Sequence, residues 1–167
     1  MARRDVGVSG EEFLMSVLKC GILGACMVCG NMATGQGLQG VLVAEPQVAT
    51  GHFTTALEVK PILSATRSNW VAVREWEMQD LIYVTHIWAW RCGLVQLEVS
   101  VNSGPFEIWP LPECHLDTST PNAILEKDGL PYKTYAPNAV IEIAVRVTYD
   151  DLTTEMARFP RSAILLP

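Results

Sequence analysis

Residues 88–114 decide the fold class, and they read WAWRCGLVQLEVSVNSGPFEIWPLPEC. We interpret WAWRC as the end of one strand and NSGP, residues 102–105, as a hairpin turn, because Asn, Gly and Pro favour tight turns. A turn at the centre of NSGP pairs residues whose numbers add up to about 207, which places Cys92 and Cys114 close to facing positions. The register predicts a disulfide in an oxidising compartment and two buried thiols in a reducing one.

Strand patterns continue on both sides of this hairpin. Residues 94–101 alternate apolar and polar side chains, which is typical of a strand with one buried face. Residues 81–90 are apolar in both alternating sets and predict a central strand that is covered on both faces. We expect further strands at residues 70–77, 106–111, 132–135, 139–149, 153–159 and 163–166, and a helix at residues 61–65. The sequence therefore predicts a mainly β fold, an antiparallel β-sandwich or open barrel with one or two short helices.

The composition describes a folded, acidic chain in three parts. Hydrophobic residues make up 49% of the 167 residues and charged residues 18%, which excludes a disordered chain. We divide it into an apolar N-terminal segment (1–35), a linker or edge strand (36–56) and a β-rich domain (57–167). The net charge of -6 and the lack of a Lys/Arg stripe argue against binding to nucleic acid.

The N-terminal segment has the pattern of a signal peptide. An uncharged apolar run of about 14 residues follows Lys19, which is shorter than the roughly 20 residues that span a bilayer. Small residues offer cleavage after Gly30 or Gly35. This interpretation predicts a periplasmic or secreted protein with no stable membrane span in its mature form.

A second interpretation keeps this segment in the folded protein. Glu11 and Glu12 are unusual in the basic start of a signal peptide, although a start at Met15 instead of Met1 would remove them. Ser9 and Glu12 form a capping-box pattern, which predicts a buried helix in a cytoplasmic protein.

Tryptophans on the strand at residues 70–77 suggest a binding surface. Trp70 and Trp76 share a face with Arg74, so we expect part of their aromatic surface to be exposed. An exposed aromatic patch on a sheet is a common platform for small ligands or proteins.

The long connection at residues 112–131 is a second candidate site, because long loops often carry function. His115 and Asp117 lie in it next to Cys114, at a spacing that can chelate a cation. His86 fits a packed core histidine better than a ligand. Since nucleophile elbows, phosphate loops and zinc-helix motifs are missing from the sequence, we predict no catalytic residue, metal ligand or cofactor.

Five runs give the chain a resemblance to known proteins: RSNWVAVREWE, DLIYVTHIWAWRCGL, SVNSGPFE, PNAI at residues 121–124 and VTYDD at residues 147–151. They are similar to small exported bacterial β-rich proteins that have no assigned activity, over roughly residues 57–160. The resemblance implies export and a bridged cysteine pair, and it transfers no activity.

Three functional hypotheses follow from these patterns. The first is a non-catalytic exported domain that binds a protein or small ligand through its aromatic sheet face or the 112–131 loop. The second is an intracellular structural or oligomerising protein with a docked N-terminal helix. The third is a hydrolase or metal-dependent enzyme built around His86 or His115.

Overall fold

The structure is a computed structural model that describes residues 42–167. The expected apolar segment at residues 1–35 and the first residues of the expected linker lie outside this part. The helices and strands are α1 Ala56–Ala65, η1 Arg67–Asn69, β1 Ala72–Trp76, β2 Gln79–Tyr83, α2 Thr85–Trp88, η2 Arg91–Gly93, β3 Leu94–Val101, β4 Glu107–Ile108, η3 Glu126–Asp128, β5 Tyr132–Tyr135, β6 Glu142–Tyr149, β7 Thr154–Pro160 and α3 Arg161–Ile164.

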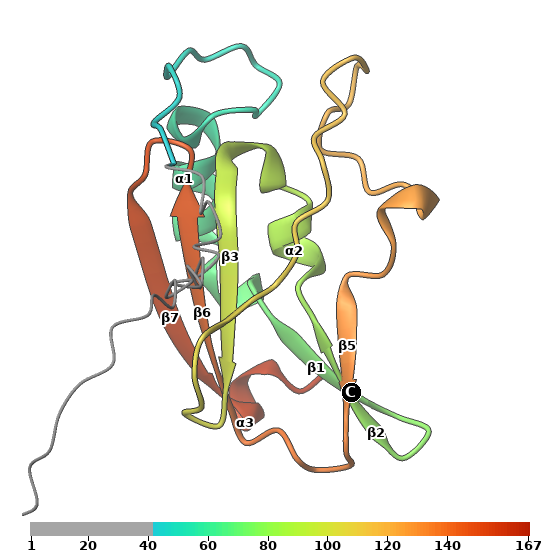
Figure 1. The fold of residues 1–167 in the computed structure, drawn as a ribbon. Coiled ribbons are helices and arrows are strands. Elements are labelled where there is room, and N and C mark those ends of the chain that lie inside the picture. The colour runs from blue at the N-terminus through green and yellow to red at the C-terminus, as the bar shows by residue number, and fades with distance from the viewer. Residues whose placement is uncertain (1–41) are drawn as a thin grey trace, which may run out of the picture. The chain divides into compact units, whose positions relative to one another are not determined.

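The strands form two antiparallel sheets, so the predicted mainly β fold is confirmed. One sheet has the order β1–β2–β5 and the other the order β4–β3–β6–β7. Figure 1 shows β3, β6 and β7 side by side in the second sheet. Val73 and Ile82 of the first sheet share one buried cluster with Leu97 and Val145 of the second. The core therefore lies between the sheets, as in a β-sandwich.

The hairpin that joins β3 to β4 has nearly the predicted register. Glu98 faces Ile108 and Val99 faces Glu107, one residue off the expected pairing. The shift arises because Asn102 and Ser103 both adopt positive φ angles and centre the turn one residue earlier. Beyond the open end of this ladder, the predicted bridge is confirmed, since Cys92 and Cys114 form a disulfide with their Cα atoms 5.4 Å apart.

The expected strand at residues 81–90 is wrong beyond Tyr83. The chain instead forms α2, in which the Trp88 N–H donates to the carbonyl of Val84 at 3.0 Å, and then η2. Residues 84–90 are mainly apolar, and a short apolar segment has no periodicity that separates strand from helix. A helix also lets the chain turn from the first sheet to the second, and Gly93 completes this turn where a Cβ would lie 2.9 Å from the backbone of Thr55.

Helix α1 begins five residues before the predicted start at Pro61. Its buried side chains, Ala56, Val59 and Leu63, recur on one face at helical spacing. Pro61 lies inside the helix on its exposed side. Proline has no N–H to donate to the preceding turn, and water can donate to the carbonyl that is left free there.

The C-terminal segment contains less strand than predicted. Residues 161–164 form the short helix α3, and only Leu165 makes a parallel bridge, to Val73. The Leu166 N–H donates to the Val73 carbonyl at 2.8 Å. This contact covers part of the free edge of β1.

Candidate functional site

Trp70 does not belong to a binding surface. Its side chain is 0% exposed, and its indole Nε1 donates to the Leu63 carbonyl at 2.9 Å. Strand β1 begins only at Ala72, so Trp70 does not follow the alternation that was expected for residues 70–77. The expectation of an exposed Trp70 is therefore wrong, because this residue anchors α1 to the core.

Arg74 and Trp76 lie together on the outward face of β1. The Arg74 guanidinium lies 4.5 Å from the centroid of the Trp76 ring, and Trp76 is 50% exposed. Val73, between Ala72 and Arg74, points into the core. This half-exposed cation–π pair keeps the charge and the indole fixed relative to each other.

Two tyrosines extend the same face across the sheet. Tyr83 faces Ala72 on one side and Tyr132 on the other, and the two tyrosine rings lie 5.1 Å apart. We call Arg74, Trp76, Tyr83 and Tyr132 the outer aromatic face. The face offers aromatic surface and one permanent positive charge.

A groove of about 550 Å³ begins at Arg74 and runs toward α2. Its lining consists of Asn69, Ala72, Arg74, Tyr83, Thr85, His86, Ala89 and Leu166, none of which is acidic. The volume and the largely apolar lining with a few polar groups are typical of small-molecule sites. The groove suits an apolar or aromatic body that carries a negative charge.

His86 lies in the wall of this groove on α2, not on a strand. Its Nε2 atom is 2.7 Å from the Thr66 hydroxyl oxygen. Partial burial lowers the pKa of His86, because a buried imidazole loses the hydration that favours its charged form. His86 therefore adds a neutral polar group near pH 7, and Arg74 remains the fixed cation of the groove.

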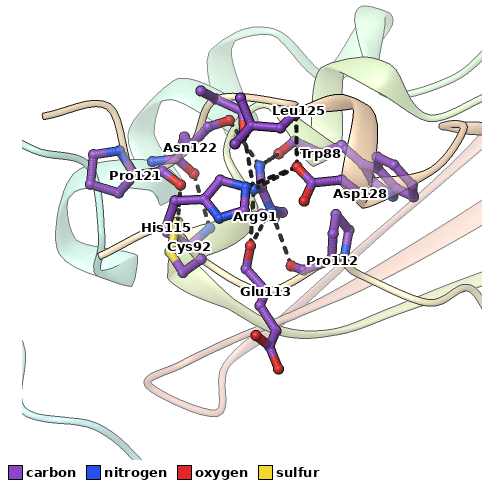
Figure 2. Close-up of polar contacts among 12 residues, drawn as sticks. Trp88, Arg91, Cys92, Pro112, Glu113, His115, Pro121, Asn122, Leu125 and Asp128 are labelled. Atoms are coloured by element: carbon purple, nitrogen blue, oxygen red, sulfur yellow. Dashed lines mark hydrogen bonds and ion pairs between the residues drawn. A yellow bond between two sulfur atoms is a disulfide. The ribbon is translucent and has the colours of Figure 1, made fainter. Parts of the chain in front are cut away.

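The loop at residues 112–131 is held in place by Arg91 (Figure 2). The Arg91 side chain is 1% exposed and lies among backbone carbonyls from the start and the middle of the loop. It donates to the carbonyls of Pro112 at 3.1 Å, Glu113 at 3.0 Å, Asn122 at 2.8 Å and Ala123 at 3.1 Å. One side chain thereby provides hydrogen-bond donors for backbone carbonyls that the loop would otherwise leave unpaired.

Asp128 and His115 complete this loop anchor, which we define as Arg91, His115 and Asp128. His115 Nε2 and Asp128 Oδ2 are 3.0 Å apart, and the Leu125 N–H donates to the same carboxylate at 2.9 Å. The Leu125 N–H and then His115 lower the pKa of Asp128. The carboxylate therefore stays ionised opposite Arg91.

His115 and Asp117 do not form one surface. The His115 side chain is 8% exposed and points into the loop anchor, whereas Asp117 is exposed to solvent. Cys114, which lies next to the expected chelating pair, is bridged to Cys92. Within residues 42–167, no three His, Cys, Asp or Glu side chains gather in a way that could hold a metal ion.

Comparisons with known proteins add no assignment. No family model, no curated protein and no solved structure matches this chain. A search of the described helices finds none with the length and apolar character needed to cross a bilayer.

Proposed function

We propose that this chain is an exported, non-catalytic domain that binds a small organic anion through the outer aromatic face and the adjoining groove. The observation that carries the proposal is the position of Arg74, which stacks on the exposed Trp76 and also lines the groove. A ligand carboxylate beside Arg74 would leave the aromatic or apolar part of the ligand against Tyr83 and Ala72. The arrangement matches concave sites that use apolar area for affinity and one charge for orientation.

The groove favours a small ligand over a protein partner. Its volume of about 550 Å³ falls in the range of drug-sized ligand sites. The alternative binding element, the loop at residues 112–131, is tied down by Arg91 through several carbonyls. A loop that is fixed in this way suits a structural role better than the role of an adaptable binding segment.

Export is supported by the disulfide and by the pattern of the N-terminal sequence. Bridged cysteines persist in oxidising compartments and are rare in the cytosol, which favours the periplasm or the extracellular space. The apolar run in residues 1–35 has the length of a signal-peptide core.

Calorimetric titration of the full chain with benzoate and indole-3-acetate tests the proposed binding. We expect both anions to bind and their neutral counterparts, benzyl alcohol and indole, to bind at least about tenfold more weakly, because a charged hydrogen bond contributes about 1.5–3 kcal/mol. Arg74→Met should remove this preference for the anion. Arg158→Met is the matched control, since Arg158 is also exposed on a strand but pairs with Glu142 in the other sheet. Equal binding of anions and neutral compounds, or an Arg74→Met variant that behaves like wild type, would contradict the proposal.

A further inference from the structure

A second cavity lies between the free edges of the two sheets, and none of its residues lines the groove described above. Strand β4 ends one sheet and β5 ends the other, and in residues 42–167 no strand joins them. Between them the structure has a narrow cleft of about 110 Å³. The side chains that matter for its chemistry are Val99, Glu107, Trp109, Lys133 and Tyr135.

Aromatic and aliphatic groups form one wall of this cleft. Trp109 is buried, and the Lys133 ammonium lies 4.5 Å from the centroid of its ring. Lys133 follows Tyr132 on β5 and therefore points to the opposite side of the sheet, toward the core. The ammonium is thus held inside the cleft and not on the outer aromatic face.

Two opposite charges line the cleft without pairing. In the part of the chain that the structure describes, neither Lys133 nor Glu107 belongs to an ion pair. Burial and the nearby charge of Glu107 raise the pKa of Tyr135, so its hydroxyl keeps its proton. The cleft therefore presents an ammonium, a hydroxyl donor and a carboxylate to one small volume.

We propose that this cleft binds a free α-amino acid with a small side chain. The ligand carboxylate would accept hydrogen bonds from the Lys133 ammonium and the Tyr135 hydroxyl, and the ligand ammonium would donate to the Glu107 carboxylate. Its Cα and side chain would pack on Trp109 and Val99. A ligand with only one of the two charges would contact only one of these two side chains, so the cleft favours a zwitterion.

The volume limits the size of the amino acid. An engineered protein cavity of about 150 Å³ holds benzene, and this cleft is smaller, at about 110 Å³. Glycine, alanine and serine fit this limit, whereas an aromatic amino acid does not. The site is independent of the groove, since it uses other residues and a different ligand chemistry.

Titration of the ¹⁵N-labelled full chain with L-alanine tests the site, with propionate and ethylamine as probes that each carry one charge. We expect alanine to shift the amide signals of Glu107, Trp109 and Lys133, and to bind at least about tenfold more tightly than either single-charge probe. Phenylalanine should leave these signals unchanged. Equal effects of alanine and propionate, or no shift at these residues, would overturn the proposal.

Matched variants distinguish a direct role of the two charges in binding from an effect of the overall charge of the protein. Lys133→Met and Glu107→Gln should each weaken alanine binding at least about tenfold, whereas Lys127→Met and Glu126→Gln, in η3, should leave it unchanged. Glu107 is exposed on β4, so Glu107→Gln keeps the test valid if Lys133→Met fails to fold. Unchanged alanine binding in Glu107→Gln would overturn the assignment of the ammonium subsite.

Discussion

Arg91 and Asp128 form a buried ion pair in which the guanidinium Nη2 and the carboxylate Oδ2 are 3.4 Å apart. Both side chains are nearly inaccessible, with 1% and 4% of their surface exposed. Arg91 precedes the bridged Cys92, and Asp128 is the last residue of η3, so the pair connects the start of the loop to its end. The ion pair makes the long connection at residues 112–131 part of the folded body.

Arg91→Met is expected to lower the free energy of unfolding by about 3–5 kcal/mol, because breaking a buried ion pair leaves one charge without its partner. Urea denaturation of the purified variant measures this loss. Arg158→Met removes a half-exposed ion pair with Glu142 and should cost less than about 1 kcal/mol. Equal losses in the two variants would contradict a structural role for Arg91.

The disulfide should stabilise the fold by closing a loop and so restricting the unfolded chain. Cys92 and Cys114 are 22 residues apart, and the loop-entropy model gives about 3 kcal/mol for a loop of this size. Cys92→Ser and Cys114→Ser should therefore melt several degrees below the wild type under oxidising conditions. With reductant the three proteins should melt at similar temperatures, and an unchanged wild-type melting temperature after reduction would contradict this prediction.

Asp80 should make stability depend on pH in the acid range. Its carboxylate is buried and accepts hydrogen bonds from Arg161 at 2.7 and 2.9 Å, which lower the pKa of Asp80. The unfolded chain therefore binds this proton more readily than the folded one. The stabilising contribution is complete above the unfolded pKa of about 3.9 and is lost as the pH falls through the lower folded value.

Asp80→Asn isolates this contribution. The wild type should lose more stability than Asp80→Asn when the pH falls from 5 to 2, as measured by the denaturation midpoint in urea. Asp117→Asn is the control, because Asp117 is exposed and outside this ion pair. Identical pH profiles for wild type and Asp80→Asn would show that Asp80 does not carry the effect.

The two tryptophans at the ends of the 70–76 segment should lose very different amounts of stability on truncation. Trp70→Ala is expected to cost about 3–5 kcal/mol of unfolding free energy, because the ring is buried and its Nε1 bonds to Leu63. Trp76→Ala removes a half-exposed ring and should cost about 1 kcal/mol or less. Comparable losses in chemical denaturation would show that Trp76 also belongs to the core.

The hairpin and the half-buried strands follow from local rules, so they are visible in the sequence. Residues 95–101 alternate apolar and polar side chains, and turn residues at 102–105 leave little choice of register. Helix α2 cannot be predicted from the sequence. Residues 81–90 are largely apolar in both alternating sets and show no helical period. The chain turns there because it passes from one sheet to the other. The burial of Trp70 is not predictable from the sequence, because the start of β1 at Ala72 has no sequence signal.

The site is less predictable than the fold because it is assembled by tertiary packing. Exposure of Arg74 and Trp76 follows from their spacing on one strand, but the groove also needs His86 from α2 and Leu166 from the C-terminal segment. Arg91 gives only a weak signal, a single cation in the apolar WAWRC sequence. Its carbonyl partners lie up to 32 residues away in the chain.

Amide chemical shifts of the ¹⁵N-labelled full chain, recorded during titration with indole-3-acetate, test the proposed binding role most directly. We predict saturable shifts that centre on Arg74, Tyr83 and His86, with no change at Ala123 or Asp128 in the 112–131 loop. Shifts confined to that loop, or none up to millimolar ligand, would contradict the assignment of the outer aromatic face and its groove as the binding site.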